Sequence, residues 1–212
     1  MRADRSVALE LAGIGAAAIV FVATIRVRPP YLDFALAGVA VALIVVSAAR
    51  SRRLWTLARA VDAEASSRAA WQASLAFTAV ALLALAIAAV LVARAAGVPL
   101  AERFGNWHML AAAPLYFGWA LLQQYIFQFY WLGRWLQLVP SWAAVALTVL
   151  AFSAVHYPRW PVMALTLVAC TVWSLIYLRW RRLLPLVISH GLLGTALHYW
   201  VFGNDLLERW LP

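Results

Sequence analysis

The sequence predicts an all-α membrane protein, a polytopic transmembrane helical bundle of about seven spans. Hydrophobic residues make up 66% of the 212 residues and charged residues only 12%, whereas a soluble domain carries about 25% charged residues. The mean hydropathy is +0.85. Much of the apolar surface must therefore face lipid rather than a core surrounded by water.

Seven apolar segments lie between clusters of charged residues, which is the pattern of a multi-pass membrane protein. The fifth is short for a spanning helix, so we expect it to be tilted or lengthened at its ends. The segments are Val7–Ile25, Phe34–Ala49, Ala73–Ala93, Leu110–Leu132, Trp142–His156, Pro161–Leu178 and Leu183–Phe202.

The basic residues are 17 arginines and no lysine, and the formal net charge is +9. The arginines cluster between apolar runs, so we expect membrane lipids with anionic head groups as partners, and no nucleic acid. More arginines lie on the side of the N-terminus than on the other, which predicts a cytoplasmic N-terminus. A basic set made only of arginine is compatible with a GC-rich genome, and hence with a bacterial inner membrane.

We expect one integrated membrane domain with two parts. Residues 1–109 form the N-terminal transmembrane helices, and the arginine-rich loop at 50–71 predicts an amphipathic helix on the cytoplasmic surface. Residues 110–203 form a core in which the unusual polar residues are concentrated.

The stretch between Phe104 and Asn204 contains no carboxylate, yet its apolar segments carry glutamines and histidines. Lipid offers these side chains no hydrogen-bond partner, so they must pair within the bundle, and such residues often mark functional sites. Gln124 and Gln128 are four residues apart, which places them on one face of an α-helix. Hydrogen bonding between helices is the alternative interpretation of the glutamines. The candidate residues are Gln123, Gln124, Gln128, His156 and His190.

Two kinds of catalytic site are not expected. Ser153 and Ser189 lie near His156 and His190 in the sequence, but no acid is available to orient an imidazole in a nucleophilic pair. Histidines without HExxH spacing or a nearby carboxylate are a weak zinc signal, so no metal and no cofactor are expected.

The order and spacing of the polar residues resemble the CAAX protease and bacteriocin-processing family, also called the Abi or type II CAAX endopeptidase family. Its motifs EExxxR, FxxxH and HxxxN follow one another on successive membrane helices, and the resemblance covers Leu110–Phe202. FxxxH is intact, as Phe152 and His156, and the first histidine of HxxxN is His190. The remaining positions differ: Gln123 and Gln124 replace the two glutamates, Gln128 replaces the arginine and Gly194 replaces the asparagine.

The resemblance implies an intramembrane endopeptidase with catalytic positions Gln123, Gln124, His156 and His190, lined by Gln128, Phe152 and Gly194. A glutamine in place of the catalytic glutamate cannot accept a proton, and Gly194 has no side chain to donate a hydrogen bond. Three hypotheses follow. The first is that the chain is a divergent endopeptidase with His156 as base. The second is that it is an impaired member of the family (a pseudoenzyme) that acts as an immunity or maturation factor. In that role it would bind a membrane peptide, a lipidated tail, or a prenylated or leader-peptide substrate. The third, disfavoured by the motif order, is a small transporter or structural bundle.

Overall fold

The computed structural model describes residues 2–24, 30–59 and 63–210, and every element in these ranges is helical. The all-α prediction is confirmed. The chain forms two compact units, each described separately below. Unit 1 consists of Met1–Ala63 and Tyr125–Arg181, and unit 2 consists of Glu64–Gln124 and Arg182–Pro212.

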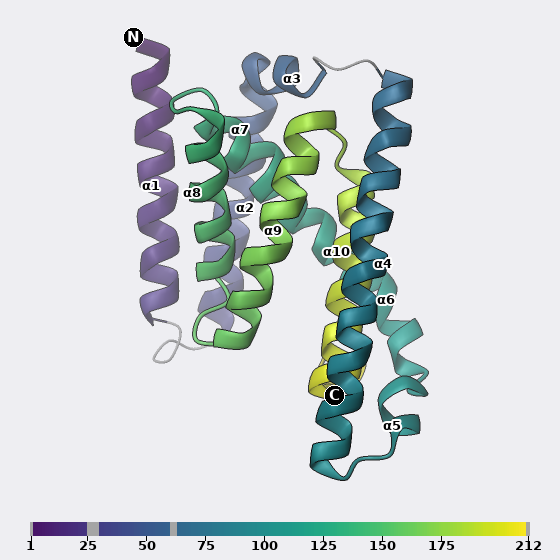
Figure 1. Ribbon diagram of the computed structural model, residues 1–212. Helices are drawn as coiled ribbons and strands as arrows, with labels where there is room; N and C mark the ends of the chain where they lie inside the picture. The colour runs from purple at the N-terminus through teal and green to yellow at the C-terminus, as the bar shows by residue number, and fades with distance from the viewer. Residues whose placement is uncertain (1, 25–29, 60–62, 211–212) are drawn as a thin grey trace. The chain divides into compact units, whose positions relative to one another are not determined.

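Unit 1 is organised around a buried π-helix, η1, which contacts α2, α3, α8 and α9. Helices α8 and α9 pack side by side (Figure 1). The helix bounds are α1 Arg2–Thr24, α2 Pro30–Arg50, α3 Arg52–Arg59, η1 Tyr125–Leu132, α7 Gly133–Trp135, α8 Ser141–Ala154 and α9 Trp160–Trp180. Helix α3 lies in the loop where an amphipathic helix was predicted at 50–71, and residues 60–62 of that loop lie outside the described residues.

Unit 2 is built on the packing of α10 against α6. Helix α4 joins α10 through two hydroxyls: the Ser74 hydroxyl donates to the Pro185 carbonyl over 2.8 Å, and the Thr78 hydroxyl lies 2.7 Å from the Ser189 hydroxyl. The helix bounds are α4 Ala63–Ala96, α5 Leu100–Phe104, α6 His108–Gln124, α10 Leu184–Ala196, η2 Leu197–Phe202 and α11 Leu206–Trp210.

Prolines and glycines mark several helix ends. A proline stands in the first turn of α9 and of α10, where its missing N–H leaves no hydrogen bond unmade. Gly97 and Gly203 adopt positive φ angles of 66° and 62° after α4 and η2. This left-handed conformation, which glycine tolerates best, ends each helix and turns the chain.

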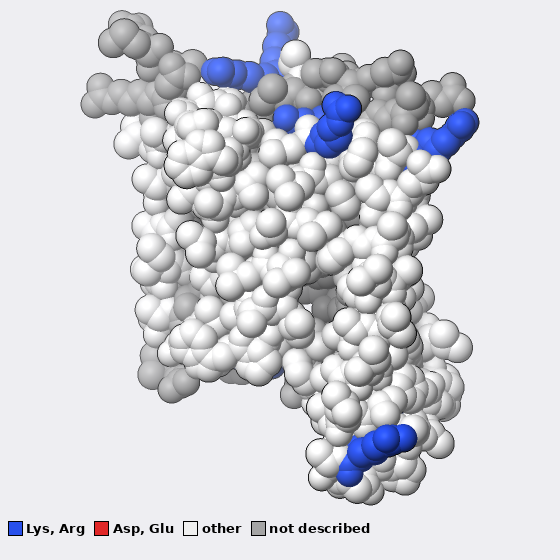
Figure 2. Space-filling model, in the orientation of Figure 1, with Lys and Arg blue, Asp and Glu red and all other residues white. Residues whose placement is uncertain are grey.

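The exposed surface is apolar, as expected for a protein in lipid. On α4, the side chains of Val80, Leu83, Ile87 and Leu91 are each more than half exposed. Most of the described side chains drawn in Figure 2 are uncharged, and no acidic side chain is visible in this view. A large uncharged surface of this kind favours lipid over water as the surrounding medium.

Two of the described helices are long and apolar enough to cross a membrane, Ser67–Ala96 and Trp160–Trp180. Seven spans were predicted, and that number stays a prediction. Two of the predicted segments contain shorter α-helices: α8 has 14 residues, and α6 has 17 residues before the chain continues as the π-helix η1.

An ion pair between a buried arginine and a partly exposed carboxylate connects three parts of unit 1. Arg134, which is 6% exposed, lies 3.1 Å from the Glu10 carboxylate. Its guanidinium also donates to the hydroxyls of Ser47 over 2.7 Å and Ser51 over 3.1 Å. The hydroxyls of Tyr130 and Ser47 donate to the same carboxylate. Arg134 follows one of the predicted apolar segments, and the structure places it inside the unit, where Glu10 supplies its counter-charge.

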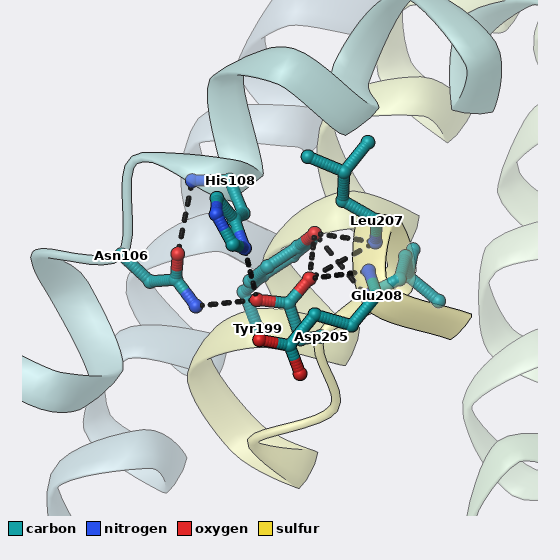
Figure 3. Close-up of polar contacts among 7 residues, drawn as sticks. Asn106, His108, Tyr199, Asp205, Leu207 and Glu208 are labelled. Carbon is teal, nitrogen blue, oxygen red and sulfur yellow. Dashed lines mark hydrogen bonds and ion pairs between the residues drawn. The ribbon is translucent and has the colours of Figure 1, made fainter. Parts of the chain in front are cut away.

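A second polar cluster joins the starts of α6 and α11 in unit 2 (Figure 3). One oxygen of Asp205 accepts hydrogen bonds from Asn106 over 3.0 Å and from His108 Nδ1 over 2.7 Å. The other oxygen accepts from the Tyr199 hydroxyl and from the backbone N–H groups of Leu207 and Glu208, which is how an N-cap residue satisfies a helix start.

Hydrogen bonding controls the charge of Asp205. Burial by itself raises the pKa of this carboxyl. The donors Asn106, the Glu208 backbone, His108 and Tyr199 outweigh burial and lower its pKa from 3.8 to about 2. The carboxylate therefore stabilises the fold fully above about pH 3.8, and this stabilisation is lost as the pH falls to about 2.

Replacing Arg134 by Met should lower the free energy of unfolding by about 3 kcal/mol, because it leaves the Glu10 carboxylate without its cation. The double variant Arg134→Met/Glu10→Gln should recover most of that loss. Thermal unfolding in detergent micelles measures both, with Arg179→Met as an exposed control that should change stability by less than about 0.5 kcal/mol. Equal stability of the single and double variants would show that the pair is not coupled.

The Asp205→Asn variant should lower the free energy of unfolding by about 1 kcal/mol at pH 5, because the amide nitrogen would face the donors of Asn106 and His108. The difference from wild type should shrink as the pH falls towards 2, where about half of the wild-type carboxyls are protonated. Thermal unfolding at pH 5 and pH 2 measures this, with Glu102→Gln on exposed α5 as the control. A difference of the same size at both pH values would contradict the role assigned to the charge.

Candidate functional site

The seven site residues predicted from the sequence fall in both units. Gln123 and Gln124 end α6 and belong to unit 2, together with His190 and Gly194 on α10. Unit 1 contains the other three, Gln128, Phe152 and His156.

In unit 2, Gln124 and His190 form a buried pair. Gln124 is 2% exposed and His190 is 6% exposed. The Gln124 amide nitrogen lies 3.4 Å from His190 Nδ1, so a donated amide proton would place the imidazole proton on Nε2. The Gln124 Oε1 has no hydrogen-bond partner among the described residues. Rotating the amide group by about 180° would exchange its oxygen and nitrogen, and the nitrogen would then lack a hydrogen-bond partner.

A buried amide with one unpaired end is costly, about 1–3 kcal/mol when nothing satisfies it. Such a group is stabilised by any molecule that brings a matching donor or acceptor. The pair also contains no charge, because glutamine does not ionise and the imidazole can remain neutral. Gln124 and His190 therefore form a neutral hydrogen-bonding site, and Gln123 lies half-buried next to them in the chain.

Gly194 lies one helical turn after His190 and allows a ring from α6 to approach. A Cβ atom placed at Gly194 would lie 2.2 Å from the ring of Tyr116 and 2.3 Å from its hydroxyl oxygen. The centroid of the Tyr116 ring lies 6.3 Å from that of His190. Tyr116 thus occupies the space where a side chain at position 194 would begin.

In unit 1, the FxxxH spacing orients His156. The His156 Nδ1 lies 2.7 Å from the Phe152 carbonyl, and a carbonyl can only accept, so Nδ1 carries the proton. Nε2 then holds the lone pair, which is the state of the ring that can act as a base. The Phe152 ring packs edge-on against His156 and Phe127, with centroid distances of 5.1 and 4.9 Å. Phe152 therefore fixes the ring through both its carbonyl and its side chain.

Gln128 is 1% exposed and pairs with α9. Its Oε1 accepts from the Ser174 hydroxyl over 3.0 Å, and its amide nitrogen lies 3.5 Å from the Cys170 sulfur. Gln124 and Gln128 were expected on one α-helical face. They contact different helices, because the chain between them enters the π-helix η1 and leaves the α-helical spacing. Hydrogen bonding between helices accounts for Gln128.

Both serines near the histidines bond elsewhere. The Ser153 hydroxyl donates to the Met163 carbonyl over 2.9 Å, and Ser189 pairs with Thr78. These contacts link one segment of the chain to another, and the expectation that neither serine is a nucleophile stays a prediction.

One group of side chains in the described part of the chain could hold a metal ion: His108, Asp205 and Glu208, whose ligand atoms lie within 4.8 Å of one another. Both Asp205 oxygens already accept hydrogen bonds that cap α11 and bind α6 (Figure 3). We interpret this group as structural.

Sequence reasoning missed two residues that the structure adds to these polar groups, Tyr116 and Ser174. Ser174 had a detectable signal, since it lies one helical turn after Cys170 in an apolar segment. The sequence gives no signal for Tyr116, because its contact with Gly194 depends on how α6 and α10 pack.

A comparison with protein families gives one match. The model of the Rce1-like family, described as type II CAAX prenyl endopeptidase Rce1-like, matches residues 105–196. This range contains all seven site residues predicted from the sequence, and it confirms the resemblance drawn from their order. No curated protein and no solved structure matches the chain.

Proposed function

Since residues 105–196 match the model of the Rce1-like family, described as type II CAAX prenyl endopeptidase Rce1-like, we propose that this membrane protein binds a membrane-associated peptide through Gln124 and His190. The bound peptide is a prenylated or otherwise lipidated tail, or a leader peptide. We place the chain in a bacterial inner membrane with about seven spans and a cytoplasmic N-terminus, as a maturation or immunity factor.

The observation that carries this proposal is the unpaired end of the Gln124 amide. The amide is buried, it is held by His190 at its other end, and it lacks one hydrogen bond in the described part of the chain. A peptide backbone offers both an N–H donor and a C=O acceptor, so it can satisfy either orientation of the amide. A neutral site also suits a neutral backbone, since no charge has to be desolvated when the peptide enters.

The family description supports the choice of a prenylated peptide as the ligand. Proteins of this family are described as CAAX prenyl endopeptidases. A lipidated peptide would reach the site through the membrane, with its lipid chain stabilised in the bilayer by about 0.8 kcal/mol for each buried CH₂ group.

Peptide hydrolysis is the second candidate function, and the geometry of His156 favours it. The hydrogen bond from Nδ1 to the Phe152 carbonyl leaves Nε2 able to accept a proton from water. Against hydrolysis stands the replacement of the family's two glutamates by Gln123 and Gln124. Loss of a general base lowers the rate by about 10²–10⁴-fold. Binding without cleavage is therefore our first choice.

The test uses the full chain in lipid nanodiscs and a fluorescent peptide ending in farnesyl-Cys followed by two aliphatic residues and Ser. Wild type should bind this probe, as measured by fluorescence anisotropy. Gln124→Ala and His190→Ala should each weaken binding about tenfold, because each removes a partner from a buried polar pair. Gln72→Ala, an exposed glutamine on α4, is the matched control and should bind like wild type.

Mass spectrometry of the same mixtures separates the two candidates. Release of the last three residues by wild type, and its loss in His156→Ala, would favour hydrolysis. An intact probe would favour binding alone. If wild type binds neither the farnesylated probe nor a leader peptide, or if Gln124→Ala and His190→Ala bind as tightly as wild type, the proposed function is wrong.

A further inference from the structure

One arginine of unit 2 carries a charge that the described part of the chain does not balance. Arg103 lies in α5 and is half-buried. Its Nε atom is buried and has no hydrogen-bond partner among the described residues, and none of the described carboxylates pairs with the side chain. In unit 1, by contrast, Arg134 lies 3.1 Å from the Glu10 carboxylate. A half-buried guanidinium without a counter-charge is costly, so an anion that reaches it stabilises it.

The end of the Arg103 side chain lies against the backbone at Gly203. A Cβ atom at Gly203 would lie 1.7 Å from one terminal nitrogen of Arg103 and 2.7 Å from the central carbon of the guanidinium. Gly203 is exposed, and its positive φ of 62° is a conformation that glycine tolerates best. The guanidinium therefore lies beside exposed backbone, where a ligand from outside can reach it.

The acid that follows Gly203 in the chain is already used. Asp205 lies two residues further on, and both of its oxygens accept hydrogen bonds that join the starts of α6 and α11 (Figure 3). Its charge stabilises that junction and does not pair with Arg103. The anion that completes Arg103 has to come from outside the described part of the chain.

A second unpaired donor belongs to the same contact between α5 and η2. The ring of Trp200, in η2, packs against that of Phe104, the residue after Arg103, with a centroid distance of 5.3 Å. The indole Nε1 of Trp200 is buried and has no hydrogen-bond partner among the described residues. Indole and guanidinium N–H groups only donate. Two unpaired donors at one contact favour a ligand with several acceptor oxygens.

Helix α5 follows the end of a helix that is long enough to cross a membrane. The apolar helix is Ser67–Ala96, and α5 begins at Leu100, after a short turn (Figure 1). Phe104 and Trp107 are 39% and 67% exposed, and aromatic side chains are enriched where a span meets water. The head groups of phospholipids lie in this layer of the membrane.

We propose that Arg103 binds the phosphate group of a membrane phospholipid at this end of unit 2, with the Trp200 indole as a second donor. A guanidinium suits a phosphate because it can form two parallel hydrogen bonds to its oxygens. The site is distinct from Gln124 and His190, since Gln124 ends α6 whereas α5 precedes the start of α6. The inference therefore does not depend on the proposed function.

The first experiment measures binding of dioleoyl phosphatidylglycerol to the full chain in dodecyl maltoside by native mass spectrometry. Arg103→Gln should weaken binding about tenfold, because it removes the charge-assisted hydrogen bonds. Trp200→Phe keeps an aromatic ring, removes the indole N–H and should weaken binding about 3- to 10-fold. Thermal unfolding without lipid should be no lower in Arg103→Gln than in wild type, since no described residue pairs with the guanidinium.

Arg94→Gln is the matched control. It removes the same charge from the last turn of α4, where the arginine is exposed, and should change binding by less than about twofold because salt screens exposed charges. Glu102 and Glu208 are exposed carboxylates of α5 and α11, so the expected affinity comes from the contact with Arg103 and not from a general positive charge. An equal loss in Arg94→Gln and Arg103→Gln would overturn the inference.

Changing the ligand identifies the group that is recognised. Dioleoylglycerol has the same acyl chains without the phosphate, and it should bind wild type and Arg103→Gln equally weakly. Phosphatidylglycerol should raise the unfolding temperature of wild type and not that of Arg103→Gln. If inorganic phosphate stabilises wild type as much as phosphatidylglycerol does, the ligand is free phosphate and the proposed lipid is wrong.

Gly203→Ala tests the place of the guanidinium. The added Cβ would displace the terminal nitrogen of Arg103, so this variant should bind phosphatidylglycerol as weakly as Arg103→Gln. The double variant Arg103→Gln/Gly203→Ala should bind no more weakly than Arg103→Gln alone, because both changes remove one interaction. If Arg103→Gln binds phosphatidylglycerol as tightly as wild type, water is a sufficient partner for the guanidinium and the inference is wrong.

Discussion

Lipid offers no hydrogen bond, so every polar side chain inside this protein depends on partners that other helices supply. This constraint explains most of the contacts that hold the described helices together. Arg134 lies inside unit 1 because Glu10 and two serines surround it. Gln128 is satisfied by Ser174 and Cys170. Several buried side chains in the described part of the chain have one polar atom without a hydrogen-bond partner, and Gln124 is the one among the seven predicted site residues. Because it belongs to that set, the unpaired end of its amide is the best indication of where a ligand binds.

Much of the fold could be predicted from the sequence, because hydropathy depends on local composition. Apolar segments and charged boundaries predicted helices close to the observed ones, and the order of Gln123, His156 and His190 predicted the similarity to the family whose model matches residues 105–196. The π-helix η1 could not be predicted, because it depends on how a wider turn packs against four helices. Glu10 lies in a segment without a motif, and its pairing with Arg134 depends on contacts between residues far apart in the chain. The contact of Tyr116 with Gly194 is of the same kind.

The positions that differ from the motif of the similar family are not equivalent in physical terms. At Gln128 the amide oxygen and nitrogen each have a partner on α9, so the side chain links two helices without a charge. At Gly194 the missing side chain is replaced by a ring from another helix. In the intact FxxxH motif, Phe152 orients the His156 ring through a hydrogen bond to its carbonyl and through packing of its own ring. The structure therefore fixes the orientation of the His156 imidazole, whereas Gln123 and Gln124 stand where the motif of the similar family has two glutamates.

Because the helical geometry changes between Gln124 and Gln128, the side chains of these two residues contact different helices. In a regular α-helix they would share one environment, and a mutation at one would disturb the other. Here the first is linked to α10 and the second to α9. A substitution at one of these positions therefore removes contacts with one helix and leaves those of the other in place. A sequence motif that is read as a single unit can thus consist of two parts with separate structural roles.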